Sequence, residues 1–160
     1  MSRMQFFIDF EFIEDGKTIE PISVGIASQD GCDFYAEFAD TDLSRADDWV
    51  KANVVPFLIG GPVQMATSDI ARLIVDFVGD EPEFWGYYAD YDWVALCRMY
   101  GRMIDLPPTW PMFCLDVKQE AHRLGVDLSE AIPPPAIEHY ALSDAIWTRD
   151  AWRYLRGMAR

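Results

Sequence analysis

The sequence is poor in positive charge. It carries 13 lysine and arginine residues against 27 acidic ones, which gives a net charge of −14 at pH 7. A chain this acidic cannot hold long duplex DNA by neutralising its phosphates, which is the sequence-independent route to affinity. Local action on nucleic acid stays open if divalent cations supply the missing positive charge.

Cysteines and long apolar runs are also scarce. Cys32, Cys97 and Cys114 form no Cys-x-x-Cys pair, which argues against a disulfide framework or a zinc site and favours a reducing cytoplasm. Acidic residues interrupt the N-terminal apolar run by Asp9, so no secretory signal is expected. The longest uncharged stretch, residues 54–68, is broken by prolines and glycines and is too short to span a bilayer. We therefore expect a soluble, cytoplasmic protein.

The remaining composition is that of a globular protein. Of the 160 residues, 51% are hydrophobic and 14% aromatic, enough for a sizeable core in one domain covering residues 1–160.

Periodicity and turn residues predict alternating strands and helices. Strands are expected over residues 4–13, 19–27, 32–39, 83–88 and 112–115. Helices are expected over 44–53, 68–78, 92–100, 117–124 and 138–158, with Ser44 and Ser68 as N-caps of the first two. This order predicts an α/β fold: a mixed β-sheet, formed by a three-stranded antiparallel meander plus further strands, flanked by α-helices.

The first expected strand contains two carboxylates, Asp9 and Glu11, among aromatic and branched residues. Side chains alternate across a strand, so Phe10 and its apolar neighbours share one face while both acids share the other. Two unit charges about 6–7 Å apart repel by roughly 2–3 kcal/mol at an effective dielectric near 20, and burial adds a desolvation cost. A divalent metal ion would relieve both. The alternative is an edge strand with one wet face, on which the acids are ordinary solvated charges.

Two later segments can supply further ligands. Asp92 stands at the start of an expected helix, where an N-cap is the alternative role for it and for Asp90. Asp144 belongs to a stripe of small and apolar residues on the last helix, so it should face the body of the protein. His139 lies five residues earlier, in or before the first turn, from where its ring can swing toward the same site.

These motifs occur in a known order. Asp9-x-Glu11, a mid-chain Asp92 and His139-x-Ala141-x-x-Asp144 resemble the motifs of the DEDDh 3′–5′ exonucleases, which have an RNase H-like fold. The segments around Asp9 and Asp92 are more narrowly similar to the small polyadenylate-specific 3′-exoribonucleases of the RNase AS type. The resemblance spans nearly the whole chain.

The resemblance implies a metal-dependent 3′–5′ exoribonuclease. Two Mg²⁺ ions, for which Mn²⁺ can substitute, would clamp the scissile phosphate and release nucleoside 5′-monophosphates from single-stranded RNA. Asp9 would bridge both ions, Glu11 and Asp144 would complete the shell of the first, and Asp92 would hold the second. His139 would be the general base, a role that suits its near-neutral pKa.

Several alternatives stay open. Tyr140, four residues before Asp144, also fits the tyrosine branch of these exonucleases. The substrate could be DNA, as in proofreading enzymes, because sugar selectivity depends on pocket shape. An acidic binding domain that keeps this fold without catalysis is a third interpretation.

The resemblance and the aromatic residues also suggest contacts. Phe12, Tyr91 and Trp93 are candidate stacking faces for RNA bases, with core packing as the alternative. Further aromatic faces are available on Trp85, Tyr87 and Tyr88. Members of this family are often homodimers, and residues 54–65 are a candidate interface.

Overall fold

The computed structural model describes residues 3–158. Its strands are β1 (Gln5–Glu14), β2 (Ile19–Ser28), β3 (Asp33–Phe38), β4 (Gln64–Met65), β5 (Glu83–Gly86) and β6 (Leu115–Asp116). Its α-helices are α1 (Asp48–Asn53), α2 (Thr67–Val78), α3 (Asp90–Arg98), α4 (Val117–Leu124), α5 (Leu128–Ala131) and α6 (Ala141–Met158). Short 3₁₀ turns cover Leu43–Arg45, Val55–Phe57, Gly61–Val63 and Met103–Asp105.

The six strands form one mixed sheet in the order β4-β3-β2-β1-β5-β6. β1, β2 and β3 pair antiparallel, as the meander predicted, whereas β5 pairs parallel with β1 and β6 parallel with β5. β1 has a strand partner on each side over Gln5–Phe7, and further along it pairs with β2. The acids still do not lie on a wet face, because Oδ2 of Asp9 is buried and Asp92 of α3 packs against this part of β1.

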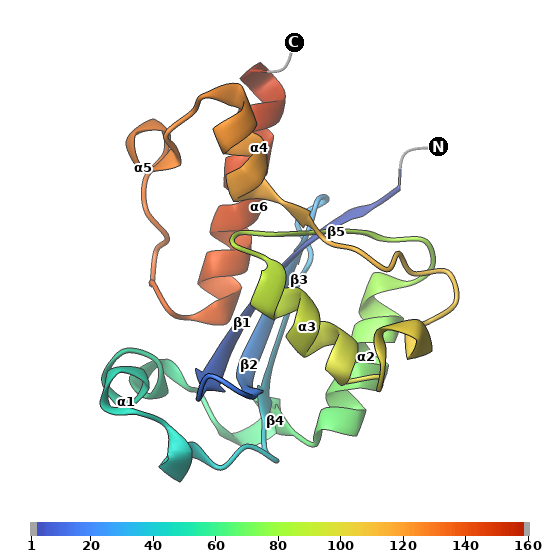
Figure 1. The fold of residues 1–160 in the computed structure, drawn as a ribbon, viewed down its shortest axis with the longest axis vertical. Coiled ribbons are helices and arrows are strands. Elements are labelled where there is room, and N and C mark those ends of the chain that lie inside the picture. The colour runs from blue at the N-terminus through green and yellow to red at the C-terminus, as the bar shows by residue number, and fades with distance from the viewer. Residues whose placement is uncertain (1–2, 159–160) are drawn as a thin grey trace.

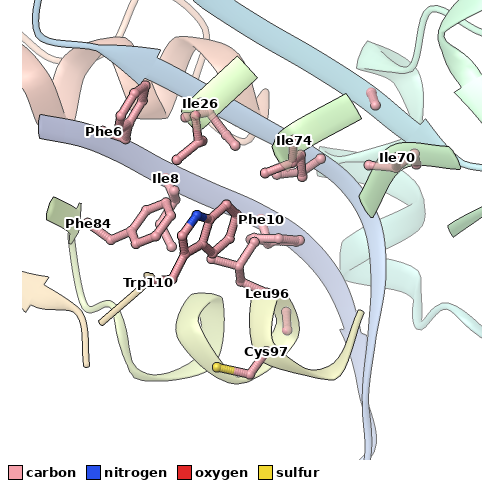
Figure 2. Packing of buried hydrophobic residues seen from close by; sticks show 14 of the residues in the cluster. Phe6, Ile8, Phe10, Ile26, Ile70, Ile74, Phe84, Leu96, Cys97 and Trp110 are labelled. Atoms are coloured by element: carbon pink, nitrogen blue, oxygen red, sulfur yellow. The ribbon is translucent and has the colours of Figure 1, made fainter. Parts of the chain in front are cut away.

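The alternating pattern of β1 buries two different faces. Phe6, Ile8 and Phe10 point into a core formed with α2, α3 and Trp110 (Figure 2). Phe7, on the opposite face, packs against Trp152 of α6 with ring centroids 5.4 Å apart. Because both faces near the start of β1 are dry, the acids further along the strand lie at the end of a buried strand.

Helices cover both faces of the sheet. α2 and α3 lie on one face, and α4 and α6 lie on the other (Figure 1). α1 lies near the end of β1, where Val50 packs with Ile13 and Ile22 in a smaller cluster (Figure 1). The end of β1 therefore meets both α1 and the start of α6.

Some predicted helix boundaries were wrong. Ser44 does not cap α1; the side chain of Asp47 accepts a hydrogen bond from the Val50 amide, and the helix begins at Asp48. Ser68 lies inside α2, which begins at Thr67, whose amide donates to Asp40 of another segment. Near both helix starts several polar residues could act as the N-cap, so the sequence alone does not show at which residue the helix begins.

The shortest elements differ most from the prediction. β4 and α5 were not predicted, and β6 occupies residues 115–116 rather than 112–115. Two-residue strands form because a neighbouring strand is present, so they leave little periodic pattern in the sequence. Among residues 3–158, none of the helices combines the length and the apolar character that a bilayer crossing requires.

Candidate active site

The two acids of β1 lie beside β2 on one face of the sheet. In the antiparallel register Asp9 is opposite Gly25, and Glu11 is opposite Ser23. A register irregularity follows between Glu11 and Phe12, and such irregularities commonly end regular pairing next to functional sites. The acids therefore lie just before a register shift, beyond which β1 stays paired with β2 to its end.

The start of α6 rests directly on β2 at Gly25. A Cβ atom built on Gly25 would lie 2.4 Å from the backbone carbon of Ala141 and 2.4 Å from the backbone nitrogen of Leu142. No side chain fits in that space, so glycine is required for this close approach. The contact sets the first turn of α6 over the strand position that faces Asp9.

Asp144 and His139 are fixed to each other at this helix start. The His139 amide donates a hydrogen bond to Oδ2 of Asp144 at 2.9 Å. His139 itself has a φ of +62°, a left-handed conformation that is uncommon outside glycine. Ligand atoms of Glu11, His139 and Asp144 all lie within 4.8 Å of one another. The structure thus joins three of the five predicted site residues in one cluster suited to a cation.

Asp92 enters the site from α3. It is only 5% exposed, and its Oδ1 accepts a hydrogen bond of 2.7 Å from the Phe10 amide of β1. It is therefore not an N-cap, because α3 already begins at Asp90 and Asp92 lies in its first turn. Asp90 is exposed and does not line the cavity, whereas Asp92 does. The geometry favours Asp92 as the third acid.

The site concentrates negative charge that the protein does not neutralise. Among the described residues, Oδ2 of Asp9 is buried without a hydrogen-bond partner. Burial, followed by the charges of Asp92, Glu11 and Asp144, raises the pKa of Asp9 well above its usual range.

The other three acids are shifted in the same direction. Burial and then the charge of Asp144 raise the pKa of Glu11 to about 8. Burial raises the pKa of Asp92 to about 7, against the lowering effect of the Phe10 hydrogen bond. Burial raises the pKa of Asp144 to about 6, although the His139 amide opposes the shift. In all four carboxyl groups the charged form is less favourable than in an exposed carboxyl group, and a bound cation would offset that cost.

A cavity of about 680 Å³ opens over these groups. Its wall includes Asp9, Glu11, Asp92, His139 and Asp144, which are all five predicted catalytic residues. This volume lies within the range of roughly 300–1,000 Å³ typical of ligand sites.

Trp49 of α1 is a cavity residue that the sequence did not indicate. Its ring contacts the His139 imidazole edge to face, with centroids 4.8 Å apart, while half of the residue stays exposed. A lone tryptophan on a six-residue helix has no periodic pattern, and its partner is far away in the chain. Only the folded chain brings the two together.

The three predicted stacking residues, Phe12, Tyr91 and Trp93, differ in their position relative to the cavity. Phe12 lines the cavity. Tyr91 packs edge to face on Phe12, with centroids 5.8 Å apart, but does not itself line the cavity. Trp93 lies against Phe84 in the core and also stays outside the cavity, so the alternative of core packing describes it better.

Tyr140 points elsewhere than the acids. Its ring packs on Tyr35 of β3, with centroids 4.9 Å apart, and it does not line the cavity. The geometry therefore favours His139 over Tyr140 as the residue that acts beside Asp144.

Comparisons with known proteins show the family of this chain. Residues 4–156 match the family described as 3′-5′ exoribonuclease Rv2179c-like domain. The chain is 38% identical over 160 residues to the 3′-5′ exoribonuclease Rv2179c of Mycobacterium tuberculosis, covering 96% of this chain and 92% of that protein.

Solved structures share the fold at low sequence identity. A structure of exonuclease I matches with a TM-score of 0.68 and 11% identity, covering 98% of this chain. The chain spans 41% of the length of that exonuclease I. The RNase domain of the yeast Pop2 protein matches with a TM-score of 0.64 and 12% identity, over 96% of this chain and 77% of that one. The predicted RNase H-like fold is confirmed.

Proposed function

The chain belongs to the Rv2179c-like 3′–5′ exoribonuclease family, and from this premise we propose that four carboxylates of the cavity, those of Asp9, Glu11, Asp92 and Asp144, form the hydrolytic centre together with His139. Asp9, Glu11, Asp92 and Asp144 would hold the divalent cations that the hydrolysis requires. We propose Mg²⁺ as the natural ion, with Mn²⁺ as a substitute, because a set of carboxylate oxygens suits these hard cations.

The residues present fit such cations. Asp9 carries a buried oxygen without a partner, and Glu11, His139 and Asp144 converge within 4.8 Å. Buried carboxylates with raised pKa values are stabilised when a cation neutralises them. When bound, the ions supply Lewis-acid polarisation of the phosphate and activation of the attacking water.

The chain's own groups would orient and deprotonate the nucleophile. A ring nitrogen of His139 accepts the proton of the water that attacks the last phosphodiester. An oxygen–phosphorus bond forms, the bond from phosphorus to the 3′ oxygen breaks, and that oxygen takes a proton from solvent. The products are a nucleoside 5′-monophosphate and an RNA shortened by one nucleotide.

Two contacts would hold the imidazole in place for this step. The hydrogen bond from the His139 amide to Asp144 fixes the backbone, and Trp49 packs against the ring. Both act before substrate arrives, so the base needs little reorganisation.

The shape of the site supports cleavage at an unpaired 3′ end. Phe12 lines the cavity next to the acidic pair and would stack on the terminal base. In a duplex the last base is paired and is stacked on its inner neighbour, so it cannot swing freely into the cavity, and the substrate would be single-stranded. The single observation that carries the proposal is the convergence of Glu11, His139 and Asp144 from β1 and the start of α6.

The test is release of nucleotides from 5′-end-labelled single-stranded RNA and DNA of matched sequence, with Mg²⁺ or with a chelator. We expect one-nucleotide steps from the 3′ end on RNA, 5′-monophosphate products and no reaction in chelator. Adenosine-rich and mixed sequences in the same series report base preference. Faster cleavage of DNA would favour the proofreading alternative.

The matched control is Asp144→Asn beside Asp90→Asn. Both remove one carboxylate charge, but only Asp144 lines the cavity. The first variant should be inactive and the second should keep wild-type activity. Full activity of Asp144→Asn would refute the proposed centre.

We also propose that the chain forms a homodimer through residues 54–65. In this segment Phe57 is 41% exposed and Ile59 is 62% exposed, an unusual amount of apolar surface for one loop. Glu37 anchors the loop, because its carboxylate accepts hydrogen bonds from the Ile59 and Gly60 amides. Light scattering should give twice the chain mass, and Phe57→Glu with Ile59→Glu should give a monomer; a wild-type monomer would refute this interface.

A further inference from the structure

Tyr88, in the loop between β5 and α3, combines strain with exposure. Its φ is +54°, it is 64% exposed, and it lines the cavity. A bulky aromatic residue in the left-handed region is an outlier, because its Cβ crowds the backbone. Glycine or asparagine would occupy this position with less strain. Because the Tyr88 ring is so exposed, it contributes little to the stability of the core. A role in the cavity would explain why a strained tyrosine occupies this position.

Other aromatic rings stand next to Tyr88. The Tyr87 and Tyr88 rings are in contact, with centroids 4.8 Å apart, and Tyr87 contacts Trp147 of α6 at 4.9 Å. Both neighbours line the same cavity. The β5–α3 loop lies next to α6 (Figure 1), which places these rings on one wall. The wall is distinct from Phe12, which follows the acids on β1.

The wall is held in place from behind. The indole N–H of Trp147 donates a hydrogen bond of 2.8 Å to the Pro133 carbonyl. Pro133 opens a run of three prolines, and Pro134 and Pro135 line the cavity. Because proline restricts the backbone, this connector is stiff. The aromatic wall is therefore largely preformed before any ligand binds.

A positive charge stands beside the wall. The ammonium of Lys118, on α4, lies 6.0 Å from the centroid of the Tyr88 ring, at the outer limit for a cation–π contact. Lys118 takes part in none of the ion pairs formed within residues 3–158. Lys118 also faces Asp127, whose pKa its charge helps to lower. Asp116 and Asp127 act on Tyr87 from the same side. A cation beside exposed aromatic rings nevertheless matches the chemistry of a nucleotide, which offers a base to stack and a phosphate to attract.

We propose that Tyr87, Tyr88 and Trp147 form a second stacking subsite, which takes the base of the nucleotide preceding the one removed. The inference rests on the proposed function, because it assumes that the terminal nucleotide lies over the acids. The cavity of about 680 Å³ contains both the acids and this wall, so it has room for more than the reacting phosphate. Stacking accepts any base, so this subsite holds RNA in place without reading its sequence.

The test is a double-mutant cycle between the protein and the RNA. Wild type and Tyr88→Ala are each given RNA that is intact, abasic at the penultimate position, or abasic at the terminal position. The rate constant kcat/KM for release of the first nucleotide is measured with Mg²⁺. Stacking on one base is worth about 1–3 kcal/mol, so the penultimate abasic site should slow wild type by roughly 5- to 150-fold. Tyr88→Ala should be slowed by a similar factor on intact RNA.

The decisive result is whether the effect of removing a base from the RNA depends on the presence of the Tyr88 ring. If the subsite exists, removing the penultimate base should cost Tyr88→Ala almost nothing more, whereas removing the terminal base should cost it as much as it costs wild type. If the penultimate penalty is the same in both proteins, the inference is refuted. A wild-type protein that releases no nucleotide even from intact RNA would instead refute the proposed function.

Three variants control for folding and for ring chemistry. Tyr88→Phe should keep wild-type kcat/KM, because it retains the stacking face. Tyr88→Gly should lose the dependence on the penultimate base as Tyr88→Ala does. Its Tm should equal or exceed that of wild type, because glycine adopts a φ of +54° without strain. Tyr154→Ala removes another exposed tyrosine, one that does not line the cavity, and should leave all rates unchanged. A loss of coupling in Tyr154→Ala would show that the effect is not specific to the proposed wall.

Discussion

Replacing Gly25 by alanine should disable the enzyme without touching any catalytic side chain. The added Cβ would stand 2.4 Å from backbone atoms of Ala141 and Leu142 at the start of α6. Backbone cannot rotate away as a flexible side chain can. The first turn of α6, which carries Asp144 and follows His139, must therefore move off the sheet.

The size of this movement follows from van der Waals contact. Carbon atoms pack at about 3.5–4.0 Å, so the gap must open by roughly 1 Å. Misplacing catalytic groups by about 1 Å can cost on the order of 100-fold in rate. Overpacking of this kind costs about 1–3 kcal/mol in stability, which lowers the Tm by roughly 2–12 °C in a chain of this size.

The assay pairs the kcat for nucleotide release with the Tm of the same samples. The matched control is Gly157→Ala, because Gly157 is in α6 itself and, within residues 3–158, no atom outside its own helix backbone lies within 4 Å of its added Cβ. That variant should gain about 0.5–1 kcal/mol from helix propensity and keep wild-type kcat. Wild-type kcat in Gly25→Ala would show that the seating of α6 on β2 does not position the site.

Four further outcomes test the charges and the base. In chelator, the Tm should fall as pH rises from about 4.5 to about 8, because the folded protein keeps protons on Glu11 (pKa about 8) and Asp92 (pKa about 7) that the unfolded chain has released. Millimolar Mg²⁺ should raise the Tm at pH 8 and flatten this profile, and a profile already flat in chelator would contradict the raised pKa values. Asp9→Asn should raise the Tm in chelator while abolishing nucleotide release; an active variant would remove Asp9 from the proposed centre. His139→Ala should lower kcat by roughly 10²- to 10⁴-fold, whereas Tyr140→Phe should stay near wild type, and the reverse order would assign the base to the tyrosine. Asp92→Ala should cost about 1–3 kcal/mol, since it leaves the buried Phe10 amide unpaired, and denaturant unfolding would measure this loss.

Local periodicity was sufficient to predict the two ends of the site. The alternation in β1 correctly separated Asp9 and Glu11 from the face of Phe6, Ile8 and Phe10. The stripe on the last helix correctly directed Asp144 inward, because residues three and four apart share one helix face. Such patterns repeat within one element, so they are visible without knowing the fold.

Contacts between elements could not be predicted in this way. The hydrogen bond from Phe10 to Asp92 joins β1 to α3, and the contact of Trp49 with His139 joins α1 to the start of α6. The glycine at position 25 carries no local sign that a helix will rest on it. Trp93 illustrates a different difficulty. It follows the candidate acid Asp92 directly in the sequence, but its ring packs against the core.

The junction of β1 with α6 has a consequence for the life of the protein in the cell. Asp9 and Glu11 are made early in synthesis and Asp144 late, so a growing chain has no complete set of acids until α6 has emerged and docked on β2. If these acids form the hydrolytic centre as proposed, the chain would gain activity only after its last helix has folded.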